Sequence, residues 1–378
     1  MKNISYIPLN GNGGGGANPA PRNYQLDVLK LVFTLFVFVS HTFIFIGENT
    51  RFKPPYGLGW VSVHFFFIVS GLLMVNSYMK REDSLPACGK RSMQFVLRKF
   101  KGIALPYYIS TLFSILLYFL IKERNNPIRT IIQDIPQLLG VRQVGLFYSD
   151  FNGVTWYISA MLLCMLPLHY LLSRNKNFFL YVFSPLAILI LFSYASSLEK
   201  PMLHHMQFYG FISGSLLRGV LGICSGAVAW TISSKLREMV QTKPQKILAT
   251  AAEILLYLLF FAVFLTPGQN HKTLFSILLI LPIPIAITFS GVSYAAMLFR
   301  WDKLRCLEPL SLMIYFNHYI ARIVVEACLP GRSYKFSVAV MFGLTILVCA
   351  LYFVIIKLLR LLWNKKLKPI FSNSETPA

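Results

Sequence analysis

The apolar segment from Leu26 to Gly47 is long enough to cross a membrane, yet it contains three ionisable side chains, Asp27, Lys30 and His41. Such groups are expensive to bury in lipid, which makes each of them a candidate functional residue. In an α-helix, Lys30 and His41 differ by only about 20° in azimuth. Asp27 and Thr34 fall within ~40° of His41 on the same side. The four residues therefore form a polar stripe along an otherwise apolar helix.

The spacing along this stripe indicates what kind of ligand would fit it. His41 lies about 16 Å beyond Lys30 along the helix axis. This distance suits an elongated anionic ligand that enters near Lys30 and presents a reactive group near His41. Two simpler interpretations remain open: Lys30 and Asp27 snorkel to the inner membrane interface, and His41 is a hydrogen-bonded histidine that bridges two helices.

Composition indicates that the elements around this stripe are membrane helices. Of the 378 residues, 56% are hydrophobic and only 13% are charged, whereas a soluble domain of this size carries far more charge. Apolar runs of about 20 residues can cross a hydrocarbon core of roughly 30 Å. We therefore predict an all-α fold, a polytopic membrane helix bundle of about ten transmembrane helices.

One transmembrane domain, residues 26–363, is predicted between a disordered cytoplasmic N-terminal tail at 1–25 and a cytoplasmic C-terminal tail at 364–378. Pro185 interrupts the fifth predicted span, and Pro282 and Pro284 kink the eighth. The predicted spans are 26–47, 58–79, 102–121, 154–172, 178–196, 211–232, 247–266, 273–299, 310–329 and 336–363.

The distribution of positive charge predicts the orientation. With the N-terminus inside, the inner segments contain 23 Lys and Arg residues and the outer segments contain 10. This asymmetry follows the positive-inside rule and predicts that both termini are cytoplasmic. The formal net charge of +22 would favour nucleic acid in a soluble protein, but here it reflects cytoplasmic loops. Membrane lipid, and no nucleic acid, is the expected partner.

Polar and aromatic residues in other spans are candidates for binding or support. Ser70 precedes Gly71 in the second span, where small residues let backbones approach closely, so both packing and a site role are open. Trp156 lies at the outer interface, where an aromatic belt residue or a sugar-stacking residue is expected. Arg218, in the middle of the sixth span, needs an anionic partner, either Glu326 or a substrate group.

The ninth span carries a second polar stripe. Tyr315 and His318 are three residues apart, so they share a helix face with Ser311, and Arg322 extends that face by one turn. An interhelical hydrogen-bond network and a catalytic site both fit this pattern. The sequence contains no Walker A motif, no Rossmann fingerprint and no His, Cys and carboxylate spacing typical of a metal site. We therefore predict no metal.

The segment RNYQLDVLKLVFTLFVFVSH (Arg22 to His41) resembles the opening motif of the acyltransferase-3 family of integral membrane acyltransferases, which includes polysaccharide and glycan O-acetyltransferases. In that family an Arg or Lys lies eleven residues before an essential histidine. Later segments resemble further family motifs in the expected order: VHFFFIVSGLLM (Val63 to Met74), FVLRKFKGIALPYY (Phe95 to Tyr108), VTWYISAMLL (Val154 to Leu163) and LEPLSLMIYFNHYI (Leu307 to Ile320). The resemblance covers the chain from one end to the other.

The resemblance implies transfer of an acyl group, usually acetyl, from cytoplasmic acetyl-CoA to a hydroxyl of a glycan or lipid-linked saccharide. His41 would be the general base, since an unperturbed pKa of ~6.5 leaves histidine mostly neutral at pH 7. Lys30 would meet a coenzyme A phosphate or line the pantetheine path. Arg98 and Lys101 occupy the family's Arg–x–x–Arg position and would hold nucleotide phosphates. An ordinary positive-inside loop is the alternative for these two residues.

The sequence departs from the family pattern at two positions. Lys101 stands where Arg is usual, and Lys30 followed by Leu31 replaces the common Arg–Gly pair. Lysine keeps the positive charge but loses bidentate geometry. The contacts with phosphate are therefore expected to differ in detail.

These expectations describe a membrane O-acyltransferase in the bacterial cytoplasmic (inner) membrane. The alternative is a secondary transporter or exporter of a lipid-linked glycan, because proline-broken helices and intramembrane charges also suit transport. Substitution of His41 separates the two functions. An acyltransferase would lose acylation of a glycan that still reaches the surface, whereas an exporter would lose surface glycan altogether.

Overall fold

The first helix starts where the sequence provides a cap. The Asn23 side chain accepts a hydrogen bond from the backbone N–H of Leu26 at 3.0 Å, which satisfies one of the free donors of a helix N-terminus. The computed structural model describes residues 23–46, 58–80, 88–121, 131–142, 151–198, 207–266 and 275–362. The predicted tails lie outside these ranges, apart from residues 23–25, which belong to the cap and first turn of this helix.

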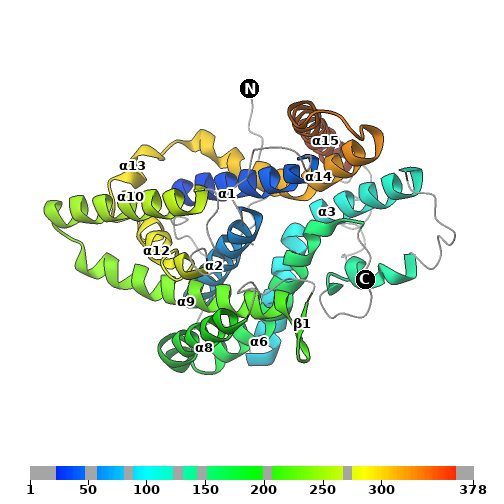
Figure 1. The fold of residues 1–378 in the computed structure, drawn as a ribbon. Coiled ribbons are helices and arrows are strands. Elements are labelled where there is room, and N and C mark those ends of the chain that lie inside the picture. The colour runs from blue at the N-terminus through cyan, green and yellow to red at the C-terminus, as the bar shows by residue number, and fades with distance from the viewer. Residues whose placement is uncertain are drawn as a thin grey trace, which may run out of the picture.

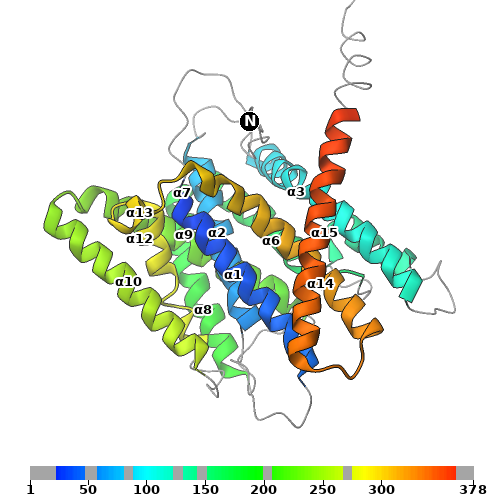
Figure 2. The same cartoon turned by 90° about the horizontal axis from the view of Figure 1, so that it is seen from above.

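Helices make up nearly all of this structure (Figures 1 and 2). Within the described ranges the only sheet is a hairpin of β1 (Phe208–Tyr209) and β2 (Ile212–Ser213), paired antiparallel. The α-helices are α1 (Tyr24–Thr42), α2 (Leu58–Met79), α3 (Cys88–Ile121), α5 (Ile135–Leu138), α6 (Trp156–Arg174), α7 (Lys176–Phe178), α8 (Ser184–Ser197), α9 (Gly214–Met239), α10 (Lys243–Leu265), α12 (Pro282–Ser290), α13 (Ala295–Leu298), α14 (Leu307–Cys328) and α15 (Tyr334–Leu362). The 3₁₀ helices η1 (Phe43–Phe45), η4 (Gly153–Thr155) and η6 (Asp302–Cys306) and the π-helical turn η5 (Phe179–Phe183) extend or connect them.

Among the described residues, eight helical segments are long and apolar enough to cross a membrane. A further apolar segment, Phe275–Ser290, is shorter, and α14 is a 22-residue helix that carries several charged residues. Large apolar side chains at four-residue spacing on α3 are exposed, as expected of a lipid-facing side: Leu112, Leu116 and Leu120. The predicted polytopic membrane bundle is confirmed, whereas the count of ten spans and the orientation stay predictions.

The third helix is longer than the sequence predicts. α3 is one 34-residue helix that begins at Cys88, whereas the predicted span begins at residue 102. At 1.5 Å per residue α3 is about 51 Å long, which exceeds a hydrocarbon core of roughly 30 Å. Its first turns therefore extend beyond such a core, and Arg98 and Lys101 lie on a helix instead of in a loop.

Proline affects the two predicted spans in different ways. Lys176–Ser197 is one membrane-length segment, because the π-helical turn η5 lies just before Pro185 and its wider turn accommodates a residue without an N–H. The eighth span, predicted at 273–299, is shorter than expected. α12 ends at Ser290, since Gly291 adopts a left-handed conformation with φ of 71°, and α13 is a separate helix.

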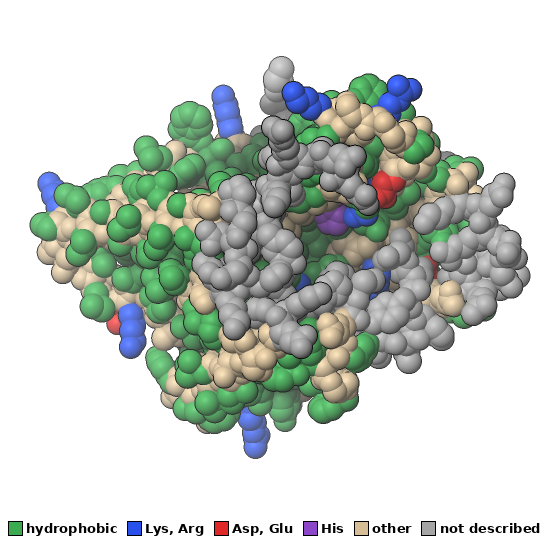
Figure 3. All heavy atoms as spheres, in the orientation of Figure 1, with side chains coloured by type: hydrophobic (Ala, Val, Ile, Leu, Met, Phe, Trp, Pro, Cys, Tyr) green, Lys and Arg blue, Asp and Glu red, His purple; other side chains and the backbone are tan. Residues whose placement is uncertain are grey.

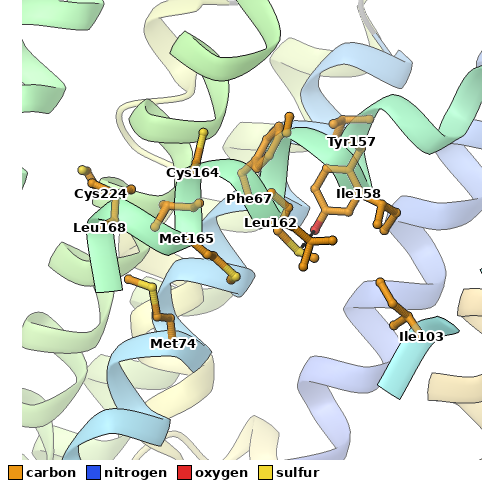
Figure 4. Close-up of a cluster of buried hydrophobic side chains, with 14 of the residues drawn as sticks. Phe67, Met74, Ile103, Tyr157, Ile158, Leu162, Cys164, Met165, Leu168 and Cys224 are labelled. Atoms are coloured by element: carbon orange, nitrogen blue, oxygen red, sulfur yellow. Dashed lines mark hydrogen bonds between the residues drawn. The ribbon is translucent and has the colours of Figure 1, made fainter. Parts of the chain in front are cut away.

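Three helices, α2, α6 and α9, form the centre of the bundle. In their most apolar stretches 61–72% of the residues are buried, against 22–28% in the other five candidate spans. A Cβ atom on Gly71 of α2 would lie 2.1 Å from the carbonyl oxygen of Ile223, and one on Gly226 of α9 would lie 2.1 Å from that of Ile68. The backbones of the two helices are therefore in contact. Arg218, in the first turns of α9, donates to the carbonyl of Trp60, in the first turn of α2, so the helices run parallel. Side chains of all three central helices meet in one buried cluster (Figure 4), which includes Phe67, Met74, Cys164, Met165 and Cys224.

Candidate active site

The polar stripe of α1 faces the polar stripe of α14, and the two helices lie side by side (Figure 2). In the middle of the contact, Thr34 Oγ1 is 2.7 Å from Ser311 Oγ. Lys30 meets Glu308 at one end, and His41 lies at the other. Higher residue numbers on α1 therefore meet higher numbers on α14, so the helices are parallel. We call this contact the α1–α14 seam.

His41 is half-buried and lies among three side chains of α14. Arg322 Nη1 is 3.1 Å from His41 Nδ1. Guanidinium nitrogens only donate hydrogen bonds, so Nδ1 is the acceptor and the imidazole proton lies on Nε2. The rings of His318 and Tyr319 are centred 4.9 Å and 5.7 Å from the ring of His41. In this arrangement His41 is neutral and its Nδ1 lone pair is occupied.

Arg322 is fixed by two further contacts. Its Nε and Nη2 donate to Glu326 Oε1 at 3.2 Å and 3.1 Å, and its guanidinium carbon lies 5.3 Å from the ring centre of Tyr319. The side chains of Arg322 and Glu326 are 20% and 33% exposed, so the pair is accessible. Glu326, one of the two predicted partners of Arg218, is thus paired with Arg322 instead.

His318 is fully buried and has the complementary tautomer. Its Nδ1 is 2.9 Å from the carbonyl oxygen of Ile314, which can only accept, so Nδ1 carries the proton. Its Nε2 therefore carries a lone pair, and this atom has no hydrogen-bond partner among the described residues. One turn earlier, the Tyr315 hydroxyl donates to the carbonyl of Val154 at 2.7 Å. Tyr315 thus fixes α14 against the segment that leads into α6.

At the other end of the seam, Lys30 lies between two carboxylates. Its Nζ is 3.1 Å from Asp27 Oδ1 and 3.4 Å from Glu308 Oε1. The Lys30 side chain is only 15% exposed. The ammonium group therefore ends inside the seam, in contrast to a lysine that simply snorkels to the interface.

The basic residues of α3 approach this end of the seam. Arg98 and Lys101 occupy exposed positions. The charge of Lys99, which lies between them, interacts with both Lys30 and Glu308. The Arg–x–x–Arg spacing drew attention to the outer two residues, whereas in the structure the charge of the middle one also acts on the seam.

Arg218 lies between two indole rings in the bundle centre. Its guanidinium carbon is 5.0 Å from the ring centres of both Trp60 and Trp156, and its Nη2 donates to the Trp60 carbonyl at 3.0 Å. Arg218 is 2% exposed and Trp156 is 8% exposed. Trp156 is therefore a buried cation–π partner, and the interpretation as an exposed belt residue is wrong.

Ser70 contributes to packing between α2 and α6. Its Oγ lies 3.0 Å from Tyr157 Oη and 3.3 Å from Met161 Sδ. Apart from Arg98 and Lys101, which lie at exposed positions of α3, the structure thus divides the predicted site residues into two groups. One group lines the α1–α14 seam, and the other, with Ser70, lies in the contacts among α2, α6 and α9.

Sequence reasoning missed Tyr319, whose ring lies beside His41, and two residues that shape the space for this ring. The ring of Tyr319 fits there because Gly153 has no side chain: a Cβ at that position would lie 2.8 Å from Tyr319 Cζ. Arg142 Nη1 donates to the backbone carbonyl just before Gly153 at 3.2 Å, which fixes this turn. Tyr319 follows His318 and points about 100° away from it on an ideal helix, so the stripe argument excluded it. The available signal was the glycine directly before VTWYISAMLL.

The face drawn in Figure 3 is hollowed, and a histidine with neighbouring Lys or Arg side chains is visible in the hollow beside an acidic side chain. Among the described residues, no group of three or more His, Cys, Asp or Glu side chains is placed to hold a metal ion. The seam offers the imidazole of His41 for proton transfer and the guanidinium of Arg322 for contact with negative charge.

A polytopic helix bundle with an accessible histidine–arginine pair inside it is an arrangement suited to an integral membrane enzyme. A family profile described as an acyltransferase domain matches residues 23–357. The chain belongs to the acyltransferase-3 family, as its motifs indicated, and is a membrane acyltransferase. Comparison with curated proteins and with solved structures gives no match.

Proposed function

We propose that the protein is an O-acyltransferase. It moves an acyl group, expected to be acetyl, from cytoplasmic acyl-CoA to a hydroxyl of a glycan or lipid-linked saccharide at the outer side of the bacterial cytoplasmic membrane. The observation that carries this proposal is the α1–α14 seam, with half-buried His41 at one end and paired Lys30 at the other. The two residues are about 16 Å apart along the helix, a length comparable to an extended pantetheine arm.

Proton transfer at His41 requires Arg322 to release Nδ1. The acceptor hydroxyl then gives its proton to Nδ1 while its oxygen attacks the thioester carbonyl carbon. The freed Arg322 guanidinium lies beside the reacting carbon and stabilises the negative oxygen of the tetrahedral intermediate. The carbon–sulfur bond breaks, and the departing thiolate takes the proton from His41. The imidazole is neutral again at the end of the reaction.

The two histidines have separate roles in this proposal. His41 is half-buried, so a bulky sugar hydroxyl can reach it, whereas His318 is fully buried. His318 packs against the ring of His41 and is assigned a positioning role. We therefore keep His41 as the catalytic base and treat His318 as the residue that holds its ring in place.

The donor end relies on exchange of one ion pair for another. A phosphate of acyl-CoA competes with Glu308 and Asp27 for the Lys30 ammonium group. The ion pairs of Lys30 with these two carboxylates keep the seam closed while no donor is bound. Lys99 adds a second positive charge near that point. Charge-assisted contacts of this kind are the stronger class of hydrogen bond.

The test is made in the native host, in a strain whose chromosomal copy is replaced by variants. His41→Ala should abolish acylation of the surface glycan, measured by mass spectrometry, while the amount of glycan at the surface stays normal. Ser40→Ala, the neighbouring change on α1, should leave both unchanged. Retained acylation in the His41 variant would overturn the proposal, and loss of the surface glycan itself would favour an exporter.

A further inference from the structure

Arg218 is a buried positive charge whose visible partners are all neutral. Only 2% of the residue is exposed, and its Nε atom is buried without a hydrogen-bond partner in the described part of the chain. It donates there to one backbone carbonyl and lies against the two indole rings of Trp60 and Trp156. The other groups that interact with its charge are His64, Tyr209 and Tyr315, none of which is a carboxylate. The ion pairs within the described ranges involve other residues.

This environment is incomplete for a buried cation. A charge removed from water needs an opposite charge or a full set of hydrogen bonds. Indole faces attract a guanidinium group, but they leave its N–H groups without acceptors. An anion placed at Arg218 would complete the set, because a guanidinium forms short, bidentate hydrogen bonds with phosphate or carboxylate oxygens.

A short segment connects Arg218 with the catalytic histidine. At one end of η4, Gly153 packs against Tyr319, whose ring contacts His41. Directly after η4, Trp156 stacks on Arg218. A 3₁₀ helix rises ~2 Å per residue, so these two ends of the segment are about 6 Å apart along its axis. This one segment therefore touches the surroundings of both His41 and Arg218.

We propose that Arg218, between Trp60 and Trp156, binds a negatively charged group of the acceptor, either a phosphate or a sugar carboxylate. This inference deepens the proposed function and rests on it. The acceptor is then an anionic saccharide or a phosphate-linked one, and the indole rings flank the charged group. Both anions share the same recognition by Arg218, so the experiment must distinguish them.

The test uses tryptophan fluorescence to measure how tightly three amphiphiles bind to the full-length protein in nanodiscs. The probes are a dodecyl glucoside (neutral), a dodecyl glucuronide (carboxylate) and dodecyl phosphate. The wild type should bind at least one anionic probe about tenfold or more tightly than the neutral glucoside. The tighter of the two anionic probes identifies the source of the charge, an acidic sugar or a lipid phosphate.

Substitution assigns the preference to this residue. Arg218→Met should bring the three affinities within about threefold of one another, a difference below 1 kcal/mol, whereas Arg237→Met, on the same helix, should bind like the wild type. Arg218→Lys keeps the charge and replaces Arg218→Met where the latter does not fold, and it should weaken the preference by loss of bidentate contact.

Two results would overturn the inference. One is equal binding of neutral and anionic probes by the wild type, and the other is an unchanged preference in a folded Arg218 variant. Failure of the proposed function is separate and has its own readout. It would appear as the absence of any His41-dependent release of coenzyme A thiol from acetyl-CoA, whatever the three probes do.

Discussion

The molecule contains two parallel helix pairs that are held together in opposite ways. Between α2 and α9 the backbones touch, because Gly71 and Gly226 lack side chains at the points of contact. Between α1 and α14 the contact is built from polar side chains, with Thr34 and Ser311 in the middle. The first contact excludes water and ligands, whereas the second has partly exposed charged groups at both ends.

We infer from this difference that the α2–α9 pair stabilises the fold and that the α1–α14 pair carries the chemistry. Close backbone packing has no alternative partners, so the α2–α9 pair is a rigid support. A polar contact can exchange one partner for another at small net cost, since each hydrogen bond contributes only about 1 kcal/mol. The α1–α14 seam can therefore open for a donor phosphate at Lys30 and for a hydroxyl at His41 while the bundle centre keeps its shape.

The largest effect is expected from a side chain placed between α2 and α9. Gly71→Leu should destabilise the protein by about 3 kcal/mol, the upper part of the range for overpacking, because the new atoms meet the backbone of Ile223. Circular dichroism during titration with dodecyl sulfate measures the change. Gly343→Leu is the matched control, since a Cβ at that helical glycine would meet no other described part of the chain within 4 Å beyond its neighbours and its own helix backbone. Equal stability of the two variants would refute the rigid-support interpretation.

Loss of Arg322 should affect catalysis more than folding. In Arg322→Met the oxyanion loses its cation, and the transfer rate should fall about 10²-fold, while the melting temperature changes little. Single-turnover transfer from acetyl-CoA gives the rate, and Arg332→Met, at the exposed turn between α14 and α15, serves as control. A wild-type rate in the Arg322 variant would remove this residue from the mechanism.

The donor end provides a smaller, directional test. Lys99→Met should raise the Kd for acetyl-CoA by about threefold, in the range of a partly screened charge, and by more than Lys101→Met does. Isothermal titration calorimetry of both variants compares them directly. The opposite order would show that the Arg–x–x–Arg spacing, and not proximity to Lys30, determines which lysine meets the phosphate.

The smallest effect is expected in the middle of the seam. Thr34→Val removes the hydrogen bond to Ser311 but keeps the shape of the side chain, so the free energy of unfolding should fall by about 1 kcal/mol. The transfer rate should stay within about twofold, because neither hydroxyl lies at the reacting end. A large loss of activity would mean that the seam transmits a rearrangement from Lys30 to His41, and the two ends could no longer be treated separately.

Helical periodicity predicted correctly which residues share a helix face, but it did not predict which residues they contact on other helices. The spacing of Asp27, Lys30, Thr34 and His41 predicted a shared face, and that face indeed lies against α14. Helical spacing did not predict that Arg322 donates to Glu326. Two charged residues one turn apart on the same helix can bond to each other, but each can also bond to a residue of another helix. Helical periodicity defines direction around one axis, whereas partner choice depends on how several helices are packed.

Boundaries and aromatic environments were the other points at which sequence reasoning failed. Charged residues before position 102 favoured a loop, yet α3 continues back to Cys88 because a helix that leaves the membrane can stay helical in water. The sequence predicted Trp156 as an interfacial residue, whereas in the structure its ring lies against the guanidinium group of Arg218. The environment of Trp156 thus depends on a long-range contact that no local pattern contains.

The central claim is that Lys30 binds the donor and His41 carries out the reaction. It is tested most directly by calorimetry of acetyl-CoA binding in nanodiscs, which compares the wild type with Lys30→Ala and His41→Ala. Lys30→Ala should weaken binding about tenfold, which corresponds to the loss of one charge-assisted contact of about 1.4 kcal/mol. His41→Ala should bind like the wild type but release no coenzyme A thiol. Absence of binding by folded wild-type protein, or equal weakening in both variants, would contradict a donor site at Lys30 that is distinct from the reacting end at His41.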